Sequence, residues 1–239
     1  MRTDGRKPEE IRPLTIEREY TMHPAGSVLV SMGKTKVLCT AMIENRVPRH
    51  CLDAGHGWVT AEYAMLPGSG DRRRSLRGST PGRSIEISRL IGRCLRGIVD
   101  LNPLGRRTIW LDCNVIQADG GTRTASITGA YVALVDALSS LKEDGKIESL
   151  PILSGLGALS VGIVEGRAMV DLCAEEDRAA SVDMNVVMTH DGRFVEVQGT
   201  AEKRAFDQEQ HDEMLELVAG AMEEVKGVQM NALAGRLAT

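Results

Sequence analysis

Several features that would point to familiar protein classes are missing from this sequence of 239 residues. The five cysteines are scattered, form no CxxC pair and are odd in number, which favours reduced, packed thiols over disulfides or a zinc site. The apolar runs are broken by charge before they reach the 18 residues expected of a transmembrane helix, and the segment MRTDGR (1–6) lacks the apolar stretch of a signal peptide. We therefore expect a cytoplasmic protein.

The common catalytic and nucleotide-binding motifs are also missing. The sequence has no GxxxxGK[ST] phosphate loop, no GxGxxG dinucleotide fingerprint and no GxSxG nucleophile elbow. Its five histidines show no HxxxH or HxxE spacing, which argues against zinc chemistry. The site must therefore be sought in other residues.

Lysine is scarce, and the arginines are unevenly distributed. The chain has 7 Lys and 22 Arg, and its formal net charge is −4. Residues 72–107 hold ten Arg against two acids, a local charge of +8 that leaves −12 on the rest of the chain. Arginine suits forked recognition of phosphate, so one arginine segment in an acidic protein indicates a local anion site.

Composition and periodicity predict an α+β fold. With 42% hydrophobic residues, the chain can bury a core and is neither disordered nor collagen-like. Alternation and turn signals predict strands, and apolar spacing of three to four residues predicts helices. The expected strands are 27–32, 35–43, 58–63, 108–118, 158–164, 167–173, 182–189 and 193–198; the expected helices are 83–100, 122–141 and 207–226. The tail from residue 227 is expected to be frayed or packed on a partner. Two portions, 1–145 and 146–239, are expected to form one compact unit.

The segment Asp119-Gly-Gly-Thr-Arg-Thr124 is the sharpest local feature. It joins an expected strand to an expected helix, where two glycines allow close approach of an anion and free N–H groups point outward. Arg83, at the start of another expected helix, is placed to meet the same anion. The alternatives are a plain turn and a solvated surface arginine.

Asp177 and Asp183 lie six residues apart where a loop runs into a strand. Beside bound phosphates they could hold Mg²⁺ or move a proton. In the alternative interpretation, Asp177 caps a turn and Asp183 is exposed on the strand. Asp is disfavoured inside strands, so Asp183 calls for a reason.

The long loop at 67–82 contains four arginines, Arg72, Arg73, Arg74 and Arg77, among glycine and serine. Such a loop fits contacts to a flexible phosphate backbone, and it fits an exposed run of charge equally well.

Taken together, these segments resemble the ribonuclease PH family, the phosphorolytic exoribonucleases that trim the 3′ ends of tRNA. The matching stretches span almost the whole chain: RTDGR (2–6), GSVLVSMGKTKVLCTA (26–41), GWVTAEYAMLP (57–67), GRSIEISRLIGRCLR (82–96), LDCNVIQADGGTRTASITGA (111–130), SVGIVEGRAMVDL (160–172) and DMNVVMTHDGRFVEVQGTAE (183–202). The stretches at 111–130 and 183–202 are long and specific.

The resemblance implies a βαβ core like that of ribosomal protein S5 domain 2, a C-terminal α/β portion, and a homohexamer built as a trimer of dimers. It implies attack of inorganic phosphate on the last phosphodiester of a tRNA precursor or other RNA, with release of a nucleoside diphosphate. We expect Mg²⁺ as the cofactor, held near Asp177 or Asp183. By position, Arg83, Gly121, Thr122 and Arg123 match the family's phosphate-binding residues. Asp177 and Asp183 match its paired catalytic or metal-associated acids, and the arginine loop matches the segment that holds the RNA 3′ end.

The sequence departs from the family pattern at Gly68, where an arginine is usual, and at Lys203-Arg204-Ala205-Phe206, where Gly-x-Pro-Phe is usual. Two other functions stay open at this stage: a non-catalytic RNA-binding ring subunit and a hydrolytic nuclease. The complete set of arginines and aspartates argues against the first of them.

Overall fold

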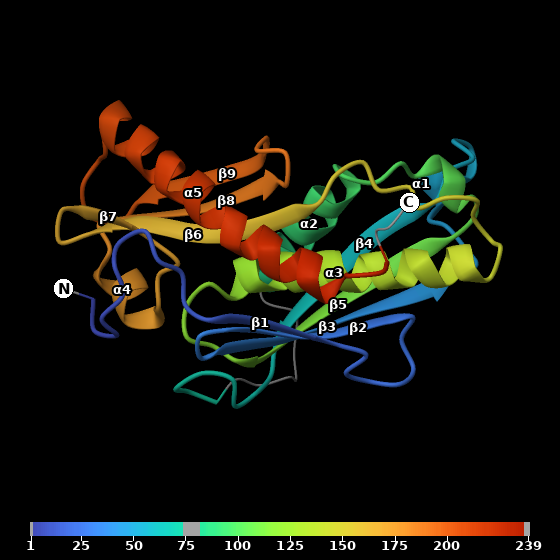
Figure 1. The fold of residues 1–239 in the computed structure, drawn as a ribbon, viewed down its shortest axis with the longest axis horizontal. Helices are drawn as coiled ribbons and strands as arrows, with labels where there is room; N and C mark the ends of the chain where they lie inside the picture. The colour runs from blue at the N-terminus through green and yellow to red at the C-terminus, as the bar shows by residue number, and fades with distance from the viewer. Residues whose placement is uncertain (1, 74–81, 237–239) are drawn as a thin grey trace.

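The computed structural model describes residues 2–73 and 82–236, which form two β-sheets with helices between and above them (Figure 1). The first sheet has the strand order β1-β2-β3-β5-β4. Its strands are β1 (Leu14–Arg18), β2 (Gly26–Met32), β3 (Thr35–Glu44), β4 (Trp58–Met65) and β5 (Thr108–Gln117). β4 pairs in parallel with β5 and the other neighbours are antiparallel, so β4 forms an edge of the sheet.

The second sheet is antiparallel, with the order β7-β6-β8-β9. Its strands are β6 (Leu156–Val164), β7 (Arg167–Val170), β8 (Val182–Thr189) and β9 (Phe194–Ala201). The predicted hairpins are confirmed, and Gly166 and Gly192 take the positive φ angles that their tight turns require. The mixed α/β fold predicted from the sequence is confirmed, whereas the division into 1–145 and 146–239 stays a prediction.

Helix α3 (Thr122–Glu143) runs between the two sheets (Figure 1). Small residues let it pack closely on the first sheet: a side chain at Gly129 would lie 2.7 Å from Val30 on β2, and one at Gly26 on β2 would meet the Ala133 backbone. By length and composition α3 is apolar enough to cross a membrane, but 94% of that stretch is buried within this protein. It is the central helix of a folded core.

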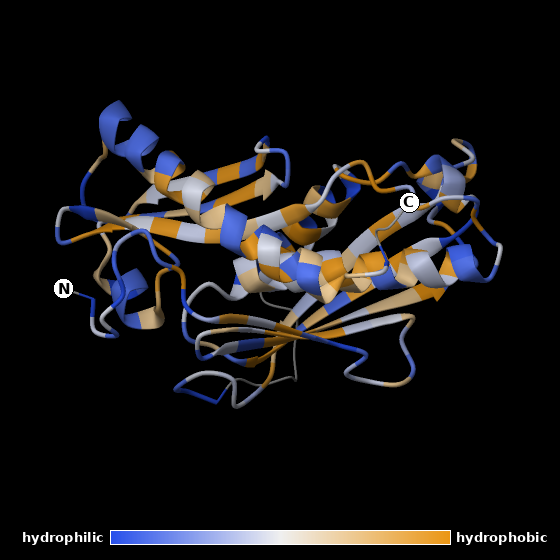
Figure 2. Ribbon diagram, in the orientation of Figure 1, coloured by the Kyte–Doolittle hydropathy of each residue, from blue (hydrophilic) through white to orange (hydrophobic). Residues whose placement is uncertain are grey.

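Helix α5 (Gln208–Ala232) lies along β6, β7 and β1 and corrects one expectation. Residues 227–232 are not frayed, because the helix continues to Ala232. Gln229 is fully buried and donates from its amide to the carbonyls of Thr128 and Leu156, at 2.9 Å each. The buried face of α5 therefore extends past residue 226, where the sequence predicted that the helix ends. Figure 2 shows the first turns of α5 as mainly hydrophilic, whereas hydrophobic and hydrophilic residues alternate further along the helix.

The remaining helices are α2 (Gly82–Arg96), which covers β4, and the short elements α1 (Arg49–Leu52), η1 (Asn102–Leu104) and α4 (Ala174–Ala179). The short elements were not predicted. α4 is stabilised by a capping box between Cys173 and Glu176, and the N-terminal segment packs against it. Buried Arg2 forms a two-pronged ion pair with Glu176, with distances of 2.7 and 2.9 Å.

Candidate active site

A cavity of about 980 Å³ opens where the first turns of α2 and α3 meet α4 and one face of β8 and β9. Its lining includes all six residues that the sequence predicts for phosphate binding and catalysis: Arg83, Gly121, Thr122, Arg123, Asp177 and Asp183. The structure thus brings together, from four elements, side chains that lie up to 100 residues apart. Exposed Arg72 and Arg73 lie outside the lining, and Arg74 and Arg77 lie outside the described residues.

The loop that enters α3 has the backbone of an anion-binding turn. Gly120 and Gly121 have consecutive positive φ angles of 77° and 63°, and Gly121 is the N-cap of the helix. The Thr124 hydroxyl bonds to the Gly121 carbonyl at 2.9 Å, and the Tyr63 and Thr122 hydroxyls lie 2.8 Å apart. Such a turn leaves backbone N–H groups at the positive end of the helix dipole. This geometry favours the predicted anion site over a plain turn.

Two guanidinium groups flank this loop. Arg123 donates to Oε1 of Gln198 at 2.9 Å and lies 3.7 Å from the Glu86 carboxylate, which is itself exposed. Arg83, the second residue of α2, is exposed and makes no hydrogen bond or ion pair within the described residues. Neither charge is neutralised by a buried carboxylate, so both remain able to bind an anion.

Asp183 faces this basic end from β8, between Gly162 and Thr200 on the neighbouring strands. Burial, and after it the nearby charge of Asp177, raises its pKa to about 6, although Arg123 opposes the shift. Asp183 is half-buried and lines the cavity, which excludes the alternative of an exposed strand residue. Asp177 is exposed within α4 rather than capping it, since Cys173 holds the cap position.

The acid pair also fits a divalent cation. Mg²⁺ usually binds through one or two carboxylates together with water and substrate phosphates, rather than in a cage of protein ligands. Asp177 and Asp183 supply two carboxylates whose mutual repulsion a cation would relieve. Within residues 2–73 and 82–236 there is no cluster of three or more His, Cys, Asp or Glu side chains placed to hold a metal, so substrate oxygens would have to complete the site.

Comparison with known families decides the class of the protein. Models of the 3′ exoribonuclease family match residues 10–139 (domain 1) and 156–219 (domain 2). The chain belongs to the 3′ exoribonuclease family. It is 52% identical over 235 residues to a protein named ribonuclease PH from Corynebacterium efficiens, covering 97% of this chain and 96% of that one. Together these matches confirm the phosphorolytic 3′→5′ exoribonuclease predicted from the sequence.

Solved structures confirm the fold of this exoribonuclease. Rice (Oryza sativa) Rrp46 superimposes with a TM-score of 0.79 at 18% identity, covering 97% of this chain and 100% of that one. An Archaeoglobus fulgidus exosome structure with RNA bound to the active site gives a TM-score of 0.82 at 22% identity, covering 95% and 91%. At these identities the likeness concerns the fold alone.

Three polar residues of the exoribonuclease cavity were missed by the sequence analysis. Ser160 on β6, Asn185 on β8 and Gln198 on β9 are register partners, and all three line the cavity beside Asp183. The alternation of strand residues contains the signal for Asn185, because a residue two positions after Asp183 must share its face. Gln198 has no such signal, since its role depends on the pairing of β9 with β8.

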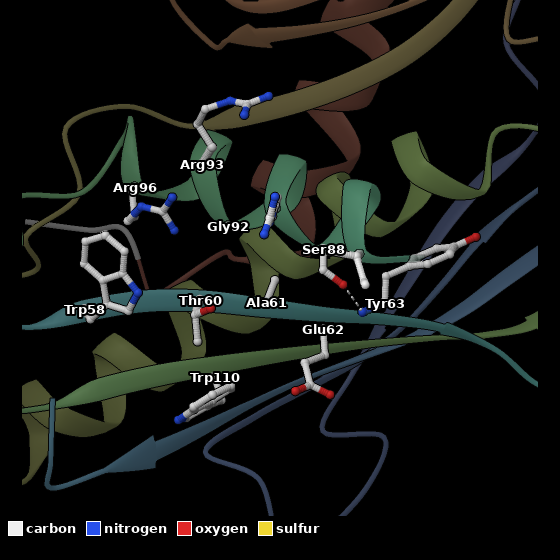
Figure 3. Close-up of a pocket in the computed structure, with 12 residues that line it drawn as sticks. Trp58, Thr60, Ala61, Glu62, Tyr63, Ser88, Gly92, Arg93, Arg96 and Trp110 are labelled. Atoms are coloured by element: carbon white, nitrogen blue, oxygen red, sulfur yellow. Dashed lines mark hydrogen bonds between the residues drawn. The ribbon is translucent and has the colours of Figure 1, made fainter. Parts of the chain in front are cut away.

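A second groove of the exoribonuclease lies between α2 and the edge strand β4, away from the acids (Figure 3). Arg96 lies 4.3 Å above the ring of Trp58 and donates to the Val59 carbonyl at 2.9 Å. Arg93 forms an exposed ion pair with Glu196 at 2.6 Å, and Arg89 lines the groove with its side chain exposed. The arginines of α2 therefore do not act as one group, because Arg96 contacts Trp58 and Val59 and Arg93 pairs with Glu196, whereas Arg89 is exposed.

Proposed function

We propose that this exoribonuclease trims the 3′ end of tRNA precursors and other RNAs by phosphorolysis, with inorganic phosphate as co-substrate. Phosphate attacks the last phosphodiester, a nucleoside diphosphate leaves, and the reverse reaction adds nucleotides from nucleoside diphosphates. One observation carries the proposal: Arg83, the glycine turn and Arg123 share a single cavity with Asp183. An anion site and an acid are thereby combined in the way that phosphate attack on RNA requires.

The basic end binds and orients the nucleophile. Inorganic phosphate is already an anion near neutral pH, so its attack needs no strong base, but it must approach another anion. Arg83, Arg123 and the N–H groups at the start of α3 reduce that repulsion and hold phosphate in line. Neither arginine has to give up a buried ion pair to do so.

The acid end serves the leaving group. Because its pKa is raised to about 6, Asp183 is able to exchange a proton near neutral pH. It is therefore suited to donate a proton to the departing ribose oxygen. Asp177 and Asp183 are the residues that would hold Mg²⁺, and the ion, when bound, would supply charge stabilisation at the transferring phosphoryl group.

The RNA strand would reach the cavity past the loop that carries Arg72, Arg73, Arg74 and Arg77, whose charges suit a phosphate backbone. The archaeal exosome structure, which has RNA at its active site, supports an RNA strand in this fold. We further propose a cytoplasmic homohexamer, a trimer of dimers. The edge strand β4 and the groove beside it, with exposed Arg89, offer a surface for subunit contact.

The test is to incubate a tRNA precursor with the protein, with and without inorganic phosphate, and to separate the products. Phosphorolysis predicts shortening only with phosphate and release of nucleoside diphosphates. Shortening without phosphate, with release of monophosphates, would indicate a hydrolytic nuclease. RNA binding with no shortening under either condition would indicate a non-catalytic ring subunit. Light scattering tests the hexamer separately.

A thermal-shift titration with Mg²⁺ tests the cation site without relying on activity. At pH 7.5 we expect Mg²⁺ to raise the melting temperature of the wild-type protein, because it offsets the repulsion between Asp177 and Asp183. The Asp183→Asn variant is expected to lose most of this response. An equal response in both proteins would place the cation elsewhere.

A further inference from the structure

In the glycine turn that enters α3, the carbonyl oxygens of Asp119 and Gly120 are held by two buried side chains, Thr35 and Arg12. The Thr35 hydroxyl donates to the Gly120 carbonyl at 2.6 Å and accepts from the Asp119 N–H at 2.9 Å. Arg12 donates from Nη1 to the Asp119 carbonyl and, at 3.5 Å, from Nη2 to the Gly120 carbonyl. Thr35 is fully buried and Arg12 nearly so, and neither lines the cavity.

Arg12 is itself held in place from the second sheet. Its Nε and Nη2 atoms bond to the two carboxylate oxygens of Asp171 at 2.9 and 2.6 Å, and its backbone N–H adds a third bond at 2.7 Å. Asp171 follows directly on β7, is fully buried and has a φ of 51°. The forked pair fixes the guanidinium plane, and it also neutralises the charge, so Arg12 does not compete with Arg83 or Arg123 for an anion.

Fixing these carbonyls fixes the N–H groups of the turn. In a trans peptide the C=O and the following N–H point in opposite directions. With the Asp119 and Gly120 carbonyls held inward, the N–H groups of Gly120 and Gly121 are turned toward the cavity that both residues line. Glycine is required at both positions: a Cβ at Gly120 would lie 2.4 Å from the Leu172 carbonyl, and one at Gly121 would lie 3.0 Å from Arg12.

We propose that Thr35 and the Arg12–Asp171 pair are positioning residues for inorganic phosphate, acting by orienting the Gly120 and Gly121 N–H groups. The inference rests on the proposed phosphorolytic function and adds residues that never touch the substrate. A turn with two glycines has many accessible conformations, and these side chains select the one whose donors converge on an anion.

Thr35→Val is the sharpest test, because it removes the hydroxyl while nearly preserving side-chain volume. Isothermal titration with inorganic phosphate is expected to show about tenfold weaker binding, because the two hydrogen bonds of the Thr35 hydroxyl that orient the turn are lost. In steady-state assays the KM for phosphate should rise by a similar factor, with the affinity for RNA unchanged. Thr35→Ser, which keeps the hydroxyl, should bind phosphate within about twofold of wild type.

Thr108→Val is the matched control. Thr108 on β5 is equally buried, and its hydroxyl donates to the Arg46 carbonyl at 2.7 Å, away from the cavity. Both valine variants should lose similar thermal stability, but only Thr35→Val should lose phosphate affinity. Arg12→Lys, which keeps the charge but not the fork, is expected to behave like Thr35→Val.

Wild-type phosphate affinity in Thr35→Val and Arg12→Lys would overturn the proposal, and so would equal losses in Thr35→Val and Thr108→Val. Arg123→Ala separates this failure from failure of the proposed function. If Arg123→Ala loses phosphate binding while Thr35→Val keeps it, the positioning role alone is wrong. If the wild-type protein binds no phosphate and releases no nucleoside diphosphate, both proposals fall.

Discussion

The two ends of the active-site cavity come from different sheets and face opposite electrostatic problems. The basic end uses the starts of α2 and α3, beside the first sheet, and keeps Arg83 and Arg123 free of buried ion pairs. The acid end uses β8 and α4 and places Asp183 where burial and Asp177 together outweigh the arginines, so its pKa rises to about 6. The basic end thus favours binding an anion, whereas Asp183 at the acid end gives up its proton only as the pH rises past about 6 and is mostly ionised at pH 7.5.

The largest expected effect is at the basic end. Arg123→Ala should lower phosphate-dependent release of nucleoside diphosphates by about 10³-fold, since it removes a forked cation from the attacking phosphate. Arg123→Lys keeps the charge but not the planar fork and should recover only part of the rate. Kinetics at saturating RNA, with circular dichroism to verify the fold, make the measurement. Normal release by Arg123→Ala would remove this residue from the phosphate site.

The acid end should respond differently. Asp183→Asn is expected to lower kcat by about 10²-fold, because it removes a group able to exchange a proton, while the affinity for RNA stays within about twofold. The contrast with Arg123→Ala, which should mainly weaken phosphate, is measured by varying phosphate and RNA independently. If Asp183→Asn weakens phosphate binding as much as Arg123→Ala does, the two ends are not functionally separate.

The same substitution should stabilise the protein at neutral pH. The pKa of Asp183 is raised to about 6 in the folded state, against 3.8 for an unperturbed aspartate, so the folded state holds the proton more tightly between those pH values. Raising the pH through that window therefore lowers the free energy of unfolding of the wild type, by on the order of 2–3 kcal/mol in full.

Asp183→Asn has no carboxyl to ionise and so avoids this loss of stability as the pH rises. It should be the more stable protein at pH 7.5, and the gain should disappear below about pH 4, where the wild-type carboxyl is protonated in both states. Urea denaturation at the two pH values, without phosphate or Mg²⁺, provides the measurement. A gain that is independent of pH would mean that repacking, and not charge, explains it.

The difference between the two ends also governs how much the sequence could predict. The glycine turn and Arg123 are contiguous, so their place between a strand and a helix could be recognised from the local sequence alone. Asp177 and Asp183 needed the family resemblance, because their spacing fits a capped turn and an exposed strand equally well. The strands and long helices followed from periodicity, since burial of one face imposes a period on the residues.

What the sequence could not provide was long-range pairing. Arg12 reads as a charge in a polar N-terminal segment, and only the fold brings it to Asp171 and to the Asp119 carbonyl. The end of α5 was placed too early because Gln229 looks like a surface residue, whereas its amide satisfies two buried carbonyls. The short helix α4 depends on a cap by Cys173, which is not among the usual N-cap residues.

The smallest expected effect concerns Gln198, which reaches from the second sheet to the basic end. It accepts from Arg123 at 2.9 Å, and it lies on β9 opposite Asn185. Gln198→Ala frees the Arg123 side chain to adopt other rotamers, so the KM for phosphate should rise about threefold with kcat nearly unchanged. Gln208→Ala, on the exposed first turn of α5, is the control and should alter neither constant. A loss confined to kcat would instead place Gln198 at the acid end. Arg123, which Gln198 contacts, would then contribute to both ends of the cavity.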